Sequence, residues 1–257
     1  MKAVILAGGL GTRFSEETSI RPKPMIEIGG RPILWHIMKH YARYGLTEFI
    51  LCLGYRGVVI KEYFANYQLR WNDVTLRLGR HPAAEYHTDH GEEGWEVTLA
   101  DTGDEAMTGA RVKRIRKYLP PGPFCLTYAD GLSDIDLRRL IAFHRAHEKL
   151  GTVTGVRPSG RFGELHLDGD RVTSFMEKPV VEGFINGGFF VLEREFVDRY
   201  IDDGDDIVLE QEPLRRLAAE GQLKMYHHEG FWQMMDTYRE WKLLEDLWNR
   251  GKAPWNQ

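Results

Sequence analysis

The chain has 257 residues, of which 42% are apolar and 28% charged, a composition typical of a globular protein with a full core. Its net charge of −4 argues against nucleic acid as a partner. No apolar run approaches the length of a membrane span, and the N-terminal strand leaves no room for a signal peptide. Cys52 and Cys125 lie in apolar runs, which is typical of buried thiols in a reducing compartment, so we expect a cytoplasmic protein.

Strand and helix signals alternate along the first two thirds of the chain. Short apolar runs predict buried strands over residues 2–6, 49–53, 124–128 and 151–156. Helical spacing predicts helices over residues 33–43, 59–67, 137–147, about 206–219 and 238–248. This alternation indicates an α/β fold with a mostly parallel, Rossmann-like sheet and helices on both faces.

Residues 71–100 break the alternation. Apolar residues alternate at 74–78 and again at 95–99, and a polar segment separates the two stretches. We expect an irregular β insertion, either a lid or a subunit contact, within a single domain of residues 1–257. A metal site is the alternative, but the spacing fits no standard zinc pattern and no cysteine assists the three histidines, His81, His87 and His90.

The first strand runs straight into a glycine-rich turn that ends in Thr12 and Arg13. Gly8, Gly9 and Gly11 allow the backbone to approach a phosphate closely, and Arg13 offers a planar fork of donors. The turn lacks the Gly-Lys-[Ser/Thr] ending of a P-loop and the third glycine of the dinucleotide fingerprint. Taken alone, it is explained equally well as a tight turn.

A lone lysine, Lys23, follows one loop later between Pro22 and Pro24. The two prolines restrict the backbone, so that the ammonium group is aimed in one direction. The turn and the lysine together indicate a site that holds a nucleoside triphosphate by its phosphates.

Two aspartates are candidates for cation binding. Asp130 follows a buried strand, and Asp236 lies just before the last expected helix. A carboxylate in such a place can bind a hard cation. Helix N-capping is the alternative for both, although Ser133 or Asp134 suits the first helix better and Thr237 competes for the second.

The N-terminal motif resembles the signature of the sugar-1-phosphate nucleotidylyltransferases. Further stretches resemble the glucose-1-phosphate cytidylyltransferase branch of this family, and they run nearly end to end: 32–45, 54–67, 101–114, 185–192, 230–237 and 251–255. The resemblance implies the nucleotide-diphospho-sugar transferase fold, with smaller β elements on the sugar side. The irregular 71–100 segment and the tryptophans near the C-terminus fit subunit contacts, so we expect a homo-oligomer.

The implied activity is transfer of the cytidylyl group of CTP to α-D-glucose 1-phosphate, which gives CDP-glucose and pyrophosphate. CDP-glucose commonly feeds deoxysugar synthesis for surface polysaccharides. The alternatives are dTTP or UTP as donor, another hexose 1-phosphate as acceptor, and a catalytically silent subunit that binds nucleotide sugars and regulates a partner.

The resemblance also assigns roles to residues. Mg²⁺ is expected on Asp130 and Asp236, with Lys23, Arg13 and Asp130 as catalytic residues. The sugar phosphate is expected on Glu177, Lys178, Asn186 and Gly187. The nucleotide is expected on Leu6, Ala7, Gly8, Gly9, Gly11, Thr12, Arg13, Lys23, Gly103, Ala106, Arg111 and Tyr128.

Each assignment has a structural alternative. Glu177 and Lys178 are also typical of solvated surface, and the Asn186-Gly187 stretch of a β-bulge. Tyr128 is also compatible with an ordinary aromatic core residue. Ala129 stands where the family usually has glycine, so its methyl group adds bulk beside the site.

Overall fold

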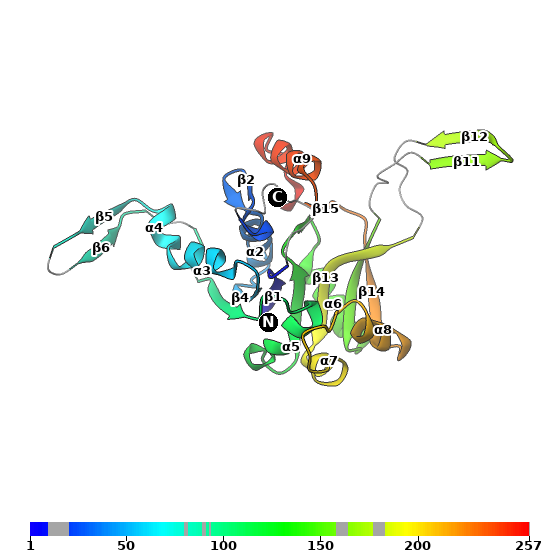
Figure 1. The fold of residues 1–257 in the computed structure, drawn as a ribbon, viewed down its shortest axis with the longest axis horizontal. Coiled ribbons are helices and arrows are strands. Elements are labelled where there is room, and N and C mark those ends of the chain that lie inside the picture. The colour runs from blue at the N-terminus through cyan, green and yellow to red at the C-terminus, as the bar shows by residue number, and fades with distance from the viewer. Residues whose placement is uncertain are drawn as a thin grey trace.

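The computed structural model describes residues 1–9, 21–79, 82–88, 91–92, 94–157, 164–176 and 183–256 (Figure 1). Among them, seven strands form a central sheet in the order β14-β10-β13-β8-β1-β4-β7. The strands are β1 (Ala3–Leu6), β4 (Glu48–Leu53), β7 (Glu96–Asp101), β8 (Pro123–Tyr128), β10 (Gly151–Val156), β13 (Ile185–Glu193) and β14 (Leu223–His228). Only β13 runs antiparallel to its neighbours in this described sheet, which confirms the mostly parallel α/β fold.

Helices cover both faces of the sheet. They are α2 (Ile33–Arg43), α3 (Gly57–Ala65), α4 (Tyr67–Trp71), α5 (Thr108–Arg114), α6 (Leu137–His147), α7 (Arg194–Tyr200), α8 (Glu212–Ala219) and α9 (Tyr238–Asn249). The short 3₁₀ turns are η2 (Lys23–Met25), η3 (Arg116–Tyr118) and η4 (Pro254–Asn256).

Strand β1 shows how the two faces are built, because successive residues of a strand point to opposite sides. Ala3 and Ile5 belong to a buried cluster that includes residues of α2, α3, α6 and α9. Val4 and Leu6 belong to a second cluster with residues of α5, α7 and α8. The near-continuous apolar sequence of the strand follows from this burial on both sides.

The helix expected from about 206 begins only at Glu212. Pro213 lies in its first turn, where proline is tolerated. The preceding backbone is bound elsewhere, because Gly109 N–H donates to the Ile207 carbonyl at 2.8 Å. The single helix expected over 59–67 is also two helices, α3 and α4, which meet at Asn66.

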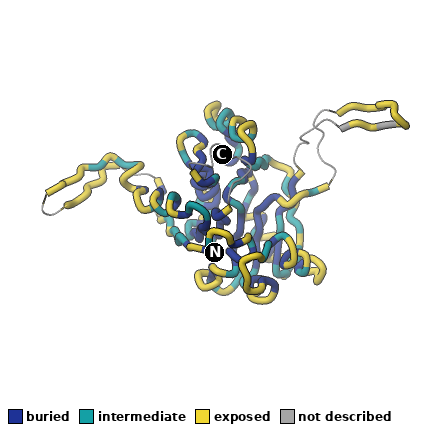
Figure 2. The backbone as a smooth tube through the Cα atoms, viewed as in Figure 1, coloured by how far each residue is buried: buried dark blue, intermediate teal, exposed yellow. Residues whose placement is uncertain are grey.

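Two hairpins project from opposite sides of the body (Figure 1), and both are largely exposed (Figure 2). One consists of β5 (Val74–Arg77) and β6 (Ala83–Tyr86), and the other of β11 (Glu164–Asp168) and β12 (Arg171–Met176). Two smaller pairs flank the sheet: β2 (Glu27–Ile28) with β3 (Arg31–Pro32), and β9 (Gly131–Ser133) with β15 (Trp232–Met234).

The sheet changes winding direction beside β1. The chain passes from β1 to β4 and β7 on one side and then returns to β8 on the other. Ligands of such sheets bind beyond the carboxyl ends of the strands at this switch point. The Gly8 turn and Asp130 both follow strands that end there.

Cys52 and Cys125 are buried and form no disulfide, as the sequence predicts. Burial raises the pKa of both thiols to about 12, so they remain protonated and unreactive. Across the described parts of the chain, every helix is too short or too polar to span a membrane.

Candidate active site

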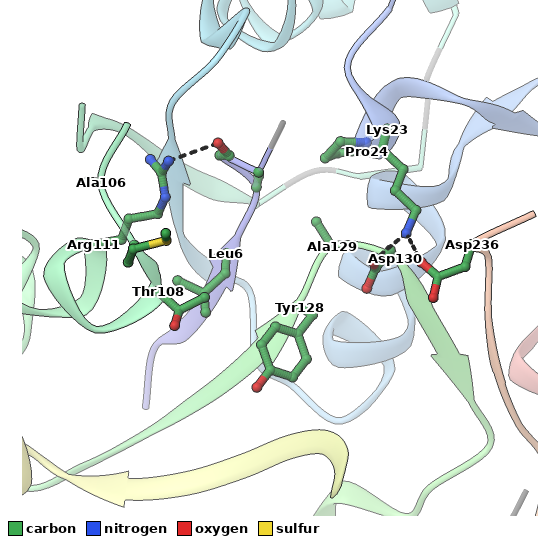
Figure 3. Close-up of a pocket in the computed structure, with 14 residues that line it drawn as sticks. Leu6, Lys23, Pro24, Ala106, Thr108, Arg111, Tyr128, Ala129, Asp130 and Asp236 are labelled. Atoms are coloured by element: carbon green, nitrogen blue, oxygen red, sulfur yellow. Dashed lines mark hydrogen bonds and ion pairs between the residues drawn. The ribbon is translucent and has the colours of Figure 1, made fainter. Parts of the chain in front are cut away.

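A cavity of about 350 Å³ opens beyond the carboxyl ends of β1 and β8 (Figure 3). It gathers ten of the described residues that the sequence assigned to a site: Leu6, Ala7, Gly8, Gly9, Lys23, Ala106, Arg111, Tyr128, Asp130 and Asp236. Pro24, Met107, Thr108 and Ala129 complete its lining. Segments that lie far apart in the sequence therefore meet at one edge of the sheet.

Lys23 lies between the two candidate aspartates. Its Nζ is 2.6 Å from Asp130 Oδ2 and 2.5 Å from Asp236 Oδ1 (Figure 3). Pro22 and Pro24 bracket the lysine at the start of η2, as expected. Burial on its own lowers the lysine pKa, but attraction and hydrogen bonds from Asp130 and Asp236 outweigh it, so the pKa lies above its usual value. The ammonium group is therefore charged.

Neither aspartate caps a helix. The N-cap of α6 is Asp136, which accepts from the Arg138 and Arg139 amides, so the expectation that Ser133 or Asp134 has this role is wrong. Thr237 caps α9 in a reciprocal capping box with Glu240. Helix capping therefore does not explain why both carboxylates line the cavity.

The carboxylate pair fits a hard divalent cation. Asp130 Oδ1 is buried and has no hydrogen-bond partner in the described part of the chain, so one oxygen of this carboxylate is available to a cation. Carboxylate oxygens are the ligands that Mg²⁺ prefers, usually with substrate phosphates completing its shell. Among the described residues no group of three or more His, Cys, Asp or Glu side chains forms a metal site, so these two carboxylates would need further ligands from a substrate.

Arg111 uses its donors on the protein itself. Its Nη1 donates to Leu53 O at 3.1 Å and Gly103 O at 2.7 Å, and its Nη2 donates to Gly8 O at 2.8 Å. The side chain is 4% exposed, and burial lowers its pKa. The sequence predicted contact with base or phosphate, whereas these bonds fasten the Gly8 turn to the segment after β7. Gly103, whose carbonyl accepts from this guanidinium, is not part of the cavity lining.

This guanidinium also explains the first glycine of the turn. A Cβ on Gly8 would lie well inside contact distance of Arg111 Nη1, and one on Gly54 would collide with the same group. A Cβ on Gly9 would meet no atom of the described residues within 4 Å. The absence of a side chain is therefore needed at Gly8 for packing, and of the two described glycines of the turn only Gly9 has no such packing reason.

Tyr128 lies at the end of β8, where it lines the cavity and also packs its ring edge-on against the buried Phe190. Its hydroxyl donates to Glu210 and accepts from Asn186 Nδ2 at 3.3 Å. Asn186 and Gly187 lie on β13, outside the cavity lining, where the register with β10 shifts. Trp232 Nε1 donates to Gly187 O at 2.8 Å and ties this strand to β15. Sequence reasoning missed Glu210, because it lies inside the helix expected over about 206–219, where an acidic side chain is typical of a solvated face.

Ala129 fits the site. It is buried and lines the cavity, and its φ is not among the positive values that the described non-glycine residues show. Its methyl group therefore adds no backbone strain.

Several predicted site residues lie outside the described residues: Gly11, Thr12, Arg13, Glu177 and Lys178. His81 and His90 of the alternative metal site also lie outside them. His87 is described, and its Nε2 lies 2.8 Å from Thr75 Oγ1 on the exposed hairpin.

Comparison with known proteins decides the family. The family model "Nucleotidyl transferase" matches residues 2–237. The chain belongs to the nucleotidyl transferase family. A glucose-1-phosphate cytidylyltransferase from Salmonella typhi is 53% identical to this nucleotidyltransferase over 257 residues, which cover 99% of this chain and 98% of the relative. A probable glucose-1-phosphate cytidylyltransferase from Bacillus subtilis is 44% identical, with 99% of each chain covered.

Solved structures support the fold of this nucleotidyltransferase. HddC from Yersinia pseudotuberculosis superposes with a TM-score of 0.70 at 23% identity, over 96% of this chain and 99% of that one. Nucleotidyltransferases generally use a divalent metal, which agrees with the two aspartates in the cavity.

Proposed function

We propose that this nucleotidyltransferase transfers the cytidylyl group of CTP to α-D-glucose 1-phosphate and releases pyrophosphate. The observation that carries the choice of substrates is the 53% identity, over nearly the whole chain, to a glucose-1-phosphate cytidylyltransferase. The cavity supports it independently, because one cationic side chain and two carboxylates converge where an α/β sheet binds ligands.

The reaction needs no general base. A phosphate oxygen of the sugar phosphate, already ionised at neutral pH, attacks the α-phosphorus of CTP in line. The bond from that phosphorus to the bridging oxygen breaks, and pyrophosphate leaves with the electron pair. Catalysis then consists of positioning two anions and neutralising their charge.

Lys23 supplies the positive charge nearest to this chemistry. Its ammonium is charged and points into the cavity, so it neutralises the charge that grows around the α-phosphoryl group. The backbone around Gly9 lies close to the triphosphate, and Arg13 clamps it and the leaving pyrophosphate. Lys178 and Glu177 hold the sugar phosphate and its hydroxyls, with Asn186 on the glucosyl side.

Asp130 and Asp236 would hold Mg²⁺. When bound, the ion supplies charge neutralisation and orientation of phosphate oxygens. The ammonium of Lys23 contacts one oxygen of each carboxylate, so a cation held by the same pair would lie close to this positive charge.

Pyrophosphate release tests this function. The purified protein is incubated with Mg²⁺ and glucose 1-phosphate, and CTP is compared with UTP, dTTP, GTP and ATP. CTP should give the highest kcat/KM. Higher turnover with dTTP or UTP would show that one of these is the nucleotide donor in place of CTP. A second comparison, with other hexose 1-phosphates in place of glucose 1-phosphate, tests the choice of sugar. Silence with every pair would favour a regulatory subunit.

We also propose a homo-oligomer in the cytoplasm. The two projecting hairpins expose apolar side chains, among them Leu78 at 89% and Phe175 at 63%, which a subunit contact would cover. Two buried, unpaired cysteines fit a reducing compartment.

A further inference from the structure

A chain of hydrogen bonds links the α5 side of the cavity to the predicted sugar-binding asparagine, with Glu210 at its centre. One carboxylate oxygen of Glu210 accepts from Thr108 Oγ1 at 2.7 Å, and the other accepts from the Tyr128 hydroxyl. Tyr128 in turn accepts from Asn186 Nδ2, and Asn186 Oδ1 accepts from Gly188 N–H at 2.9 Å. No step of the proposed reaction uses Glu210.

The backbone that carries Glu210 is held firmly. Met107 N–H donates to Asp205 O at 2.8 Å, and Gly109 N–H donates to Ile207 O at the same distance. Leu209 is fully buried, and its N–H donates to the Thr108 hydroxyl at 2.9 Å. The segment before α8 thus accepts the hydrogen bonds of the first amides of α5. Because its backbone is used in this way, α8 begins only at Glu212. The carboxylate of Glu210 is a fixed acceptor.

An ionised carboxylate suits this position because it only accepts hydrogen bonds. It accepts a hydrogen bond from each of the Thr108 and Tyr128 hydroxyls, so a lone pair of the tyrosine oxygen is left to accept from Asn186. Burial is the main cause that raises the Tyr128 pKa far above its usual value, and the charge of Glu210 adds to it. The phenol therefore stays protonated and acts as a hydrogen-bond donor. A Cβ on Gly188 would collide with the tyrosine ring, so the glycine lets the ring lie against β13.

The bonds on Asn186 determine the orientation of its amide. Its nitrogen faces the tyrosine and its oxygen faces Gly188 N–H, so the two ends cannot exchange without loss of both bonds. A primary amide has a second N–H and a second lone pair, and these can be offered to a donor–acceptor pair such as a sugar hydroxyl.

We propose that Glu210 is a positioning residue for the sugar substrate, because it sets the Tyr128 hydroxyl and thereby the amide of Asn186. This inference rests on the proposed function, in which Asn186 binds the glucosyl group. Glu210 acts through its neighbours and does not touch the reacting atoms.

Steady-state kinetics of Glu210→Gln test the proposal. A glutamine offers one accepting oxygen, so one of the two hydroxyls loses its acceptor. We expect the KM for glucose 1-phosphate to rise about tenfold, with kcat and the KM for CTP each changed by less than about twofold. Glu212→Gln, an exposed glutamate two residues along the chain, is the matched control and should leave all three constants unchanged.

Tyr128→Phe cuts the same chain at the next link and also should raise the KM for glucose 1-phosphate. The double variant should raise it no further than the larger single change, because both act on one path. If Glu210→Gln fails to fold, as judged by circular dichroism, Tyr128→Phe alone decides by whether the sugar KM rises.

Failure of this inference differs from failure of the proposed function. An active wild type with an unchanged sugar KM in folded Glu210→Gln overturns the positioning role, as does an equal rise of both KM values. A wild type that prefers another sugar 1-phosphate overturns the substrate, and the same comparison is then made with that sugar. Silence with every substrate pair overturns both.

Discussion

Lys23 Nζ lies 2.5 Å from Asp236 Oδ1, although 213 positions separate the two residues in the sequence. Asp130 contacts the same ammonium at 2.6 Å. One positive charge therefore holds two carboxylates together at the edge of the sheet. Because the same carboxylates fit a divalent cation, the lysine and the metal should compete.

Removal of the lysine should tighten metal binding and abolish turnover. In Lys23→Ala the two carboxylates face each other without compensation, so Mg²⁺ should bind the nucleotide-free protein about tenfold more tightly. Turnover should fall by about a hundredfold or more, because the charge at the α-phosphoryl group is lost.

Isothermal titration with MgCl₂ measures the first effect, and pyrophosphate release measures the second. Lys39→Ala is the matched control, since Lys39 also pairs with a buried carboxylate, Glu92, at 3.0 Å but lies outside the cavity lining. Equal Mg²⁺ affinity in wild type and Lys23→Ala would exclude the competition.

Substitutions at the neighbouring residues Asp236 and Thr237 should affect different properties, turnover in the first case and stability in the second. Asp236→Asn should lower turnover by about a hundredfold and leave a folded protein, because its carboxylate faces the cavity. Thr237→Ala removes the N-cap of α9 and should lower the free energy of unfolding by about 1 kcal/mol with turnover retained. Urea titration and pyrophosphate release separate the two, and substantial turnover in Asp236→Asn would reject its metal role.

The two described glycines of the first turn should also differ. Gly8→Ala displaces the buried Arg111 guanidinium from its carbonyl partners and should lower the free energy of unfolding by about 2–4 kcal/mol. Gly9→Ala places its methyl group against none of the described atoms, so the free energy of unfolding should change by less than about 1 kcal/mol.

The KM for CTP tests the phosphate argument at Gly9 separately. If the triphosphate lies against this backbone, the new methyl group should raise the KM for CTP about tenfold in a protein of normal stability. An unchanged KM would leave Gly9 as part of a plain tight turn.

How far the sequence predicts this site depends on the range of the interactions. Local signals place α2 and α6 at their observed bounds, because apolar periodicity and the start of each helix depend on neighbouring residues. The meeting of the Gly8 turn with Asp130 is also predictable, since parallel strands end at one edge of a sheet.

The roles of Arg111 and Glu210 are not predictable in this way. An arginine near the start of a helix suggests a ligand contact or a solvated side chain, and only the folded chain brings the Leu53, Gly103 and Gly8 carbonyls around it. Glu210 has a role only because the segment before α8 packs along α5.

The hairpin of β11 and β12 should carry a subunit contact. Phe175→Ser should shift the molar mass from light scattering toward the monomer, while the circular dichroism spectrum is retained because this side chain is 63% exposed. Ser174→Ala, on the opposite face of the same strand, is the control. A monomeric wild type would reject the homo-oligomer itself.

Two buried histidines should make the protein sensitive to mild acid. Burial lowers the pKa of His36 and His40 to about 4, against 6.5 for an ordinary histidine, and both rings accept or donate only within the protein. Both are neutral in the folded state above pH 4, whereas the unfolded chain binds protons as the pH falls below 6.5. The stabilisation is therefore complete above pH 6.5 and is lost between pH 6.5 and 4.

Acidification from pH 7.5 to 5.5 should lower the free energy of unfolding by about 1.4 kcal/mol for each of the two histidines. Urea titrations at these two pH values measure the loss, and His40→Gln should reduce it by about the same 1.4 kcal/mol, whatever its effect at pH 7.5. His227→Gln, at an exposed position on β14, is the control for the substitution itself. If His40→Gln loses as much stability on acidification as the wild type does, buried neutral His40 is not a source of the acid sensitivity.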